Sequence, residues 1–487
     1  MFIVFLIILT VIAYYINFRR IRKPLYELSG KLPDIGSFPI LGHTHWFIGG
    51  PEKLLTNIKQ LVKLLEESQS AVNKVWIGPS LYVVTLNPAD VQKILESSLQ
   101  KDSSYKFLQN WLGNGLFVAP VNIWKMHRRI LLPIFHNRFI EDYIEVFGTQ
   151  GSILVERLEE RVGKSEFDAY TYITSCMLDI VFETAMGEKM DVQHNPDTPY
   201  VRARNTVMSI IGMRFFKAWM QPDALFNLTS YSKLQKETIE LTHKFTDEVV
   251  KRKRMEFDKY GESKTNGRKD LLELLLEKNP NFTDEQLREH IDSITIAGND
   301  TTALVISYTL LMLGSHQDHQ EKVYQESKDI FGDSKRIPTK DDINKMDYLE
   351  RVIKETMRLY TVVPIIARET QEEVKLSSCT IPAGVGCAVL PFVLHRSEKL
   401  WGPDADSFNP DRFLPEISAK RHPCAYIPFS FGARNCIGRH FGMLAMKSIL
   451  ANILRTYKVT SKTSCDRLKI EILLIPVSGH LLTIEKR

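Results

Sequence analysis

The stretch Pro428-Phe-Ser-Phe-Gly-Ala-Arg-Asn-Cys-Ile-Gly-Arg439 decides how this sequence is interpreted. It places Cys436 in a loop between Gly432 and Gly438, and an apolar run typical of a helix begins at Phe441. The dipole at the start of that helix, together with nearby backbone N–H groups, would favour the thiolate form of the cysteine. A thiolate presented in this way can serve as the axial ligand of a haem iron. The competing interpretation is a buried structural cysteine in a turn.

Two further residues of this stretch have side chains suited to a haem. Phe429 would pack beside the sulfur, and Arg434 is placed to meet a haem propionate. The pattern F-x-x-G-x-R-x-C-x-G is met at every fixed position, namely Phe429, Gly432, Arg434, Cys436 and Gly438. Such a complete match rarely arises by chance, so the stretch favours a haem-binding loop.

The composition is that of a large globular body. At 487 residues the length alone suggests about three domains, but no internal linker interrupts the chain after residue 42, and we expect one body. A hydrophobic content of 44% and a charged content of 25% are ordinary for a domain with a sizeable core. The net charge of +5 weakly favours an acidic partner or an anionic membrane and argues against nucleic acid. Six scattered cysteines without a C-x-x-C pair indicate reduced thiols.

The N-terminus carries a membrane signal. Residues 2–16 are apolar apart from Thr10, and a basic cluster follows, made up of Arg19, Arg20, Arg22 and Lys23. A cleaved signal peptide is the alternative, but its basic residues would precede the apolar core and a small-residue cleavage site would follow. We therefore predict a transmembrane signal anchor over residues 1–18. By the positive-inside rule, everything after it faces the cytosol.

A connector and one large domain follow the anchor. Pro33 and Pro39 fix their φ angles and discourage helix, so residues 19–42 are predicted to form a basic, proline-bearing hinge. Residues 43–487 are predicted to form a single domain, mainly α with small β-sheets, with a hairpin around Gly78-Pro79. The other expected elements are helices over 137–186, 199–220, 230–259 and 283–315, and short strands near 372–392 and 468–485.

The last of these helices carries a second chemical signal. Thr283 and Gln286 form a T-x-x-Q capping box at its start, and about 32 residues would run roughly 48 Å. Its middle, Ala297-Gly-Asn-Asp-Thr-Thr302, gathers poor helix formers, and such breaks of local rules concentrate at functional sites. A threonine hydroxyl here can bond a backbone carbonyl and open a groove for dioxygen and water. The alternative is a helix packed through small residues, with Asp300 in a core salt bridge.

A third motif points to the core rather than to chemistry. Glu355 and Arg358 are spaced i, i+3, which puts both on one helix face. A buried pair must satisfy its remaining donors elsewhere, and Arg412, in the sequence N-P-D-R-F, is the third member that we expect. We assign these three residues to folding and to haem retention.

Taken in order along the whole chain, these motifs resemble those of the cytochrome P450 family, of the microsomal type. The resemblance implies the P450 fold and a haem-thiolate monooxygenase that inserts one oxygen atom of O2 into its substrate and reduces the other to water. Cys436 would ligate the iron, and Asp300 with Thr301 would deliver protons. Segments such as 355–368 look most like the animal family-4 clan. Many family-4 fatty-acid hydroxylases carry a haem-esterifying Glu where this chain has Ala297, so we expect haem b to be bound non-covalently.

The resemblance also implies the cations that hold the haem propionates. Trp124 and Arg128 match the W-x-x-x-R of the family, and Arg368 falls where many members have a propionate-binding arginine. With Arg434 they make a set suited to bidentate bonds with carboxylates. His127 is expected to be a solvated helix residue.

Electrons are expected to come from outside the chain. The sequence has no flavin or nicotinamide fingerprint, so NADPH would act only through a partner, NADPH-cytochrome P450 reductase, with cytochrome b5 as a possible second donor. The expected location is the endoplasmic reticulum membrane, with a single span and the domain in the cytosol. The apolar stretch 207–226 is a candidate for dipping into the bilayer.

The resemblance points to an apolar substrate site. Its candidate lining residues are Phe107, Phe117, Ile211, Phe216, Ile294 and Val363. They suit a lipophilic substrate such as a fatty acid, an isoprenoid, a hydrocarbon or a xenobiotic. Two rival functions remain: a reductase-independent haem-thiolate isomerase or dehydratase, and a non-catalytic haem- or lipid-binding membrane protein. NADPH consumption with a reductase would separate both from a monooxygenase.

Overall fold

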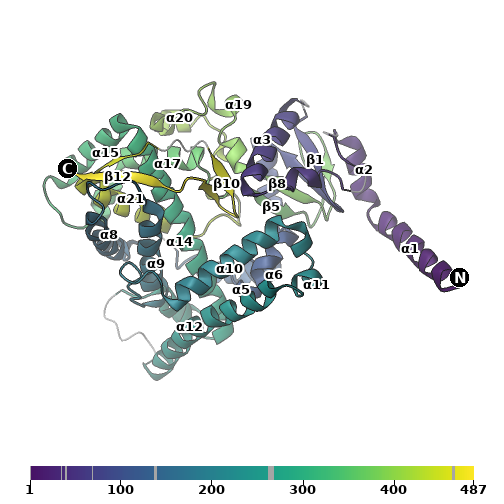
Figure 1. Cartoon of the computed structure of the whole chain (residues 1–487), viewed down its shortest axis with the longest axis horizontal. Coiled ribbons are helices and arrows are strands. Elements are labelled where there is room, and N and C mark those ends of the chain that lie inside the picture. Colours follow the sequence, from purple (N-terminus) through teal and green to yellow (C-terminus); the bar gives the residue numbers. More distant parts are fainter. Residues whose placement is uncertain are drawn as a thin grey trace.

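The helix α14 (Asp284–Ser315) runs through the middle of the protein, and the other layers pack around it (Figure 1). The computed structural model describes residues 2–33, 36–38, 41–67, 70–135, 140–260, 268–462 and 467–487. The capping box predicted at Thr283 is present: its side chain accepts from the Gln286 N–H at 3.2 Å, and the Gln286 side chain accepts from the Thr283 N–H at 3.0 Å. The predicted extent of this helix is therefore confirmed.

Helices make up most of the described chain, as predicted. Besides α14 they are α1 (Phe2–Ile21), α2 (Lys23–Lys31), α3 (Pro51–Glu67), α4 (Pro88–Ser97), α5 (Lys106–Leu112), α6 (Val121–Leu131), α8 (Ile144–Glu159), α9 (Ala169–Met186), α10 (Pro199–Phe216), α11 (Asp223–Phe226), α12 (Ser230–Tyr260), α13 (Leu271–Lys278), α15 (Gln317–Phe331), α16 (Lys340–Asn344), α17 (Asp347–Leu359), α18 (Pro391–Leu394), α19 (Glu398–Trp401), α20 (Pro415–Ser418) and α21 (Arg439–Thr456). Short 3₁₀ turns cover Thr44–Phe47, Ser103–Tyr105, Ala218–Met220, Pro410–Phe413 and Pro423–Ala425.

The strands form small sheets. They are β1 (Val72–Ile77), β2 (Ser80–Thr85), β3 (Gln100–Lys101), β4 (Phe167–Asp168), β5 (Ile366–Glu369), β6 (Val374–Lys375), β7 (Thr380–Ile381), β8 (Gly386–Val389), β9 (Tyr457–Thr460), β10 (Leu468–Ile470), β11 (Leu474–Pro476) and β12 (Leu481–Lys486). The largest sheet has the order β1-β2-β8-β5-β3, with β2 and β8 parallel. The hairpin predicted around Gly78-Pro79 is confirmed as β1–β2.

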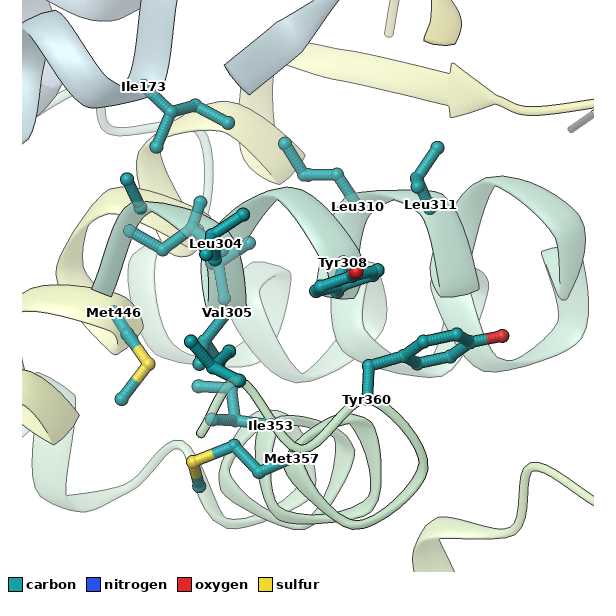
Figure 2. Packing of buried hydrophobic residues seen from close by; sticks show 14 of the residues in the cluster. Ile173, Leu304, Val305, Tyr308, Leu310, Leu311, Ile353, Met357, Tyr360 and Met446 are labelled. Carbon is teal, nitrogen blue, oxygen red and sulfur yellow. The ribbon is translucent and has the colours of Figure 1, made fainter. Parts of the chain in front are cut away.

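The largest hydrophobic cluster surrounds α14. Figure 2 shows Tyr308 of α14 facing Tyr360, their rings stacked with centroids 4.7 Å apart, and Ile353 and Met357 of α17 below the helix. The helix α14 is long and apolar enough to cross a membrane, but 83% of its most apolar window is buried inside the protein. That burial is typical of a core helix.

The stretch 137–186, predicted to be helical, contains two helices in its described part: α8 ends at Glu159 and α9 begins at Ala169. Gly163, at φ +68°, turns the chain between them, and the Asp168 side chain accepts the N–H of Tyr170 at 3.0 Å to cap α9. The interruption lets the short strand β4 pair with β12.

The described part of the predicted hinge contains a helix. The hinge residues Asp34, Ile35 and Pro39 lie outside the described residues, but the segment before them forms α2, which packs on the β1–β2 hairpin. The indole N–H of Trp76 donates to the Ser29 hydroxyl at 2.9 Å. The helix α1 before it projects away from the body (Figure 1).

Candidate functional site

The loop that carries Cys436 is folded tightly against α4. The Cys436 N–H donates to the Phe429 carbonyl at 2.9 Å, and the Asn435 N–H donates to that of Gly432 at 3.1 Å. Gly432 has φ +74°, and a Cβ there would lie 2.5 Å from the carbonyl oxygen of Leu95. The position therefore needs glycine for both its backbone angle and its space.

The thiol of Cys436 is accessible, yet much of the protein surrounds it. Burial raises its pKa, while a hydrogen bond from the Gly438 N–H and the charges of Arg128 and Arg439 act in the opposite direction. The helix α21 begins at Arg439, three residues after the cysteine. A bound metal cation would lower the pKa of this thiol and favour the thiolate.

The segment 297–302, predicted to open a groove for dioxygen and water, lies in the middle of α14, and one side of it is exposed. Ala297 is exposed although most of its neighbours in this helix are buried. The Thr301 hydroxyl donates to the Ala297 carbonyl at 2.8 Å, which is the bond expected of a threonine that loosens a helix. Thr302 contacts α21: its Oγ1 lies 3.8 Å from the place that a Cβ on Gly442 would take.

Asp300 faces away from Thr301 and is held by an arginine. Its Oδ2 lies 2.6 Å from Nη2 of Arg204 on α10, in a buried ion pair. Its Oδ1 accepts from the Tyr170 hydroxyl at 3.3 Å and from the Asn299 amide at 3.2 Å. Among the described residues, no hydrogen bond joins the side chains of Asp300 and Thr301. The core salt bridge that was the alternative for Asp300 is therefore present.

A cluster of cations lies beside the loop. Arg434 is buried, with its guanidinium carbon 4.8 Å from the centroid of the Trp124 ring. Its Nη2 donates to the Ala119 carbonyl, while Nε and Nη1 have no hydrogen-bond partner among the residues that the structure describes. Burial and the neighbouring charge of Arg368 lower the pKa of Arg434 to about 10. The Nε of Arg368 is likewise buried and has no partner among the described residues, while its Nη1 donates to the Ala367 carbonyl at 3.1 Å. This excess of buried positive charge calls for an anion.

Sequence reasoning missed a third cation, Lys101. It pairs with Arg368 across the strands β3 and β5. Burial, Arg368 and Arg434 all lower the pKa of Lys101, which places the three cations together. Only strand pairing reveals this neighbour, because the sequence around Lys101 carries no signal of its own.

One prediction for the helix that carries the W-x-x-x-R motif, α6, is wrong. His127 is fully buried, not solvated, and its ring centroid lies 4.6 Å from that of His290 on α14. The amphipathic turn of α6 puts His127 on the face that packs against α14. Arg128, predicted to reach a propionate, donates from Nη2 to the Asn435 side chain at 2.8 Å. It therefore lies against the residue next to Cys436, and its role toward a propionate stays a prediction.

The predicted cluster of three charged residues, Glu355, Arg358 and Arg412, is present in the structure. Glu355 and Arg358 are fully buried and joined by two bonds, Nε to Oε2 at 2.6 Å and Nη2 to Oε1 at 2.7 Å. The Arg412 Nε lies 3.6 Å from Oε1 of Glu355. Arg358 also donates to the carbonyls of His395, Ala405 and Ser407. The structure therefore gives the ion pair the additional hydrogen bonds that a buried pair requires.

The predicted lining residues are only partly brought together. Phe107 and Ile211 share one buried cluster with Ile296 of α14, and the residue against Phe107 is Phe215, at 5.5 Å between ring centroids, rather than Phe216. The other four are not members of that cluster: Phe117 is exposed, and Phe216, Ile294 and Val363 border three other clusters. Phe117 still lies near it, because its ring centroid is 6.1 Å from that of Tyr105, which borders the cluster.

These residues fit a haem. Cys436, the one exposed cysteine among those that the structure describes, supplies a ligand for iron. The unpartnered nitrogens of Arg434 and Arg368 are suited to carboxylates such as the propionates. Ala297 leaves open space on the flank of α14.

Comparison with known proteins agrees with this reading of the site. Residues 33–483 match the family described as Cytochrome P450. The chain is 34% identical to cytochrome P450 4c3 of Drosophila melanogaster, over 98% of this chain and 93% of that protein, and 34% identical to cytochrome P450 4V2 of Homo sapiens, over 95% and 91%. A crystal structure of the cytochrome P450DA heme domain has the same fold, with a TM-score of 0.81 at 22% identity over 94% of this chain and 98% of that one. Similarity of this extent means that the chain belongs to the cytochrome P450 family, as a haem-thiolate monooxygenase.

Proposed function

We propose that this enzyme inserts one oxygen atom of O2 into a lipophilic small molecule, with electrons that come from NADPH through a separate reductase. The observation that carries the proposal is that one loop holds both the accessible thiol of Cys436 and the unpartnered guanidinium nitrogens of Arg434. An iron ligand and a binding site for carboxylates on the same loop are what a haem requires.

Non-covalent haem b would supply the activation of O2, and thiolate ligation favours cleavage of the O–O bond. Cys436 would hold the iron. The propionates would be held by Arg434, Arg368 and Lys101, together with Trp124 and Arg128. Ala297 has no carboxyl group with which to esterify the haem.

Protons would pass through α14. The Thr301 hydroxyl, now bonded to the Ala297 carbonyl, would hold water near the reacting oxygen. Asp300 would be the second member of the pair, and it has to part from Arg204 before it can exchange protons with Thr301. Proton delivery would therefore depend on a movement between α10 and α14.

The substrate would be apolar, because the side chains between α5, α10 and α14 are apolar. Phe107, Ile211 and Ile296 are buried there together, and Phe215 and Met208 border them. Fatty acids, isoprenoids, hydrocarbons and lipophilic xenobiotics all match this lining.

A separate NADPH-cytochrome P450 reductase would deliver the electrons, with cytochrome b5 as an additional donor. An acidic partner surface would meet Arg439, which is exposed at the start of α21. Arg434 cannot take part in such docking because it is buried.

The enzyme would be anchored in the endoplasmic reticulum membrane by residues 1–18, with residues 43–487 as the catalytic domain in the cytosol. Support comes from α1, which projects from the body and exposes apolar side chains, including Phe5, Leu6, Leu9 and Ile12. Trp219, Leu225 and Leu228 are also exposed, and they would touch the bilayer surface.

The first test is the reduced, carbon-monoxide-bound difference spectrum of membranes with the wild type and Cys436→Ala. We expect the Soret band of thiolate-ligated haem in the wild type and its loss in the variant. A band typical of histidine- or thiol-ligated haem in the wild type would refute the proposal. Addition of reductase and NADPH then separates a monooxygenase, which consumes NADPH when substrate is present, from an isomerase, which does not.

A further inference from the structure

His395 lies between the Glu355–Arg358 pair and the start of the Cys436 loop. It follows the short helix α18 and is completely buried. Neither the motifs of the sequence nor the proposed chemistry gives its side chain a role.

Both ring nitrogens of His395 have defined partners. The backbone N–H of Ile427 donates to Nε2 at 2.8 Å, so Nε2 carries no proton. The proton is therefore on Nδ1, which lies 2.8 Å from the Thr361 hydroxyl and donates to it. Thr361 in turn donates to the Met357 carbonyl at 3.1 Å, in the last turn of α17. The tautomer is thus set by the network.

The backbone of His395 joins the same network. Its carbonyl accepts from Nη1 of Arg358 at 2.9 Å. Because the ring is buried and Arg358 lies nearby, the pKa of His395 falls to about 3. The imidazole therefore stays neutral and keeps Nε2 as an acceptor at physiological pH.

Ile427 is the residue from which the Cys436 loop starts. Its carbonyl accepts from the Ser430 N–H at 3.0 Å, and the carbonyl of Phe429, the residue before Ser430, accepts from the Cys436 N–H at 2.9 Å. A short series of backbone bonds thus leads from the His395 ring to the cysteine. Ile427 is itself buried, so its N–H has no access to water in place of the ring.

We propose that His395 is a positioning residue, which holds the start of the Cys436 loop to α17 through the Ile427 N–H. The inference rests on the proposed role of Cys436 as the iron ligand. Without the bond, the loop would open more often, and the sulfur would spend more time away from the place where it meets the iron.

Three substitutions separate the two bonds of the ring. In His395→Gln the side-chain oxygen reaches the position of Nε2 and can still accept from Ile427. In His395→Asn only the position of Nδ1 is replaced, so the bond to Thr361 remains and the bond to Ile427 is lost. Thr361→Ala is a milder second variant, because it frees the ring to rotate without emptying its site. His422→Ala is the control, since His422 also accepts a backbone N–H, that of Cys424 at 3.1 Å, but is exposed.

The first measurement is amide hydrogen exchange of the peptide covering 427–438 in the purified full chain. We expect about tenfold faster exchange in His395→Asn, a smaller increase in Thr361→Ala, and wild-type rates in His395→Gln and His422→Ala. The second measurement is the fraction of reduced, carbon-monoxide-bound haem that keeps the thiolate band over time. His395→Asn should lose that band faster, and His395→Gln should restore it.

Unchanged exchange over 427–438 in both His395→Asn and Thr361→Ala would overturn the proposal, as would equal loss of the thiolate band in His395→Gln and His395→Asn. If His395→Asn fails to fold, the exchange of Thr361→Ala decides. Absence of the thiolate band from the wild type would refute the proposed function instead, and the exchange data would still judge the contact between His395 and Ile427.

Discussion

Arg204 and Asp300 join α10 to α14 through a buried ion pair of 2.6 Å. Arg204 lies one turn before Val207, which belongs to the same apolar cluster as Phe107 and Ile211. The helix that contributes to the proposed substrate site therefore also holds the carboxylate proposed to move protons. In the proposed function, this pair would therefore link substrate binding to proton delivery.

Removing one partner of this pair should be costly. Arg204→Ala leaves the Asp300 carboxylate buried without its cation, and we expect a loss of about 3–5 kcal/mol in the free energy of unfolding. The double variant Arg204→Met with Asp300→Asn should recover much of that loss. Denaturant midpoints check this, with Lys233→Ala as a control from the exposed pair Lys233–Glu237. A double variant no more stable than Arg204→Ala would contradict the expectation.

Thr301 should control how much product each NADPH yields. Thr301→Val keeps the shape but removes the hydroxyl, so we expect product per NADPH to fall by about tenfold or more while NADPH is still consumed. The measurement is product and hydrogen peroxide formed per NADPH oxidised. Thr295→Val is a matched control, because Thr295 makes the same bond to the carbonyl four residues back, at 2.8 Å, in a buried part of α14. Equal effects of the two variants would assign Thr301 to helix structure alone.

Arg358 should not tolerate replacement by lysine. A lysine keeps the charge but cannot make the two bonds to Glu355 together with those to the carbonyls of His395, Ala405 and Ser407. We expect Arg358→Lys to lose about 3–5 kcal/mol of stability and to accumulate without haem, measured by the ratio of haem absorbance to protein. Arg396→Lys, next to an exposed Asp406, should retain its haem. If Arg358→Lys held as much haem as Arg396→Lys, the bonds of Arg358 would not be needed for haem retention.

A Cβ at Gly432 should disturb the Cys436 loop. Gly432→Ala and Gly163→Ala both place alanine at a positive φ, +74° and +68°, which costs about 1–2 kcal/mol in the left-handed region. Only at Gly432 does the new Cβ also meet a backbone oxygen, 2.5 Å away, whereas nothing lies within 4 Å at Gly163. We therefore expect a larger loss of stability, and loss of haem, in Gly432→Ala alone. Similar thermal midpoints and haem contents in both variants would refute the contact.

Asp292 should make stability depend on pH. Burial raises the pKa of Asp292 to about 8, against about 3.9 for an exposed aspartate, so the folded state holds its proton more tightly. The contribution of this proton to the free energy of unfolding is fully present below about pH 4. It is lost as pH rises through about 8, at up to roughly 1.4 kcal/mol per pH unit. Asp292→Asn keeps an acceptor for the Thr246 hydroxyl, which is 2.7 Å away. The unfolding midpoint of the variant should change less with pH between about pH 4 and pH 8 than that of the wild type. Equal pH dependence of the two midpoints would contradict the raised pKa of Asp292.

Several elements of the site follow from local sequence. The capping box at Thr283 predicts where α14 begins because its two bonds span only three residues. The i, i+3 spacing of Glu355 and Arg358 predicts their pairing for the same reason. Periodicity failed at His127, since it does not tell which face of α6 meets another helix.

The sequence by itself determined the family, the mainly helical fold and the candidate iron ligand, because these depend on residues close together along the chain. The tertiary structure alone decided that Lys101 joins Arg368, that Arg204 holds Asp300 and that His395 holds Ile427. Each of these contacts joins residues distant in sequence, and the strength of each depends on burial. The local sequence pattern predicts neither which residue a side chain will contact nor whether water will be excluded from that contact. Both are determined only when helices and strands pack together.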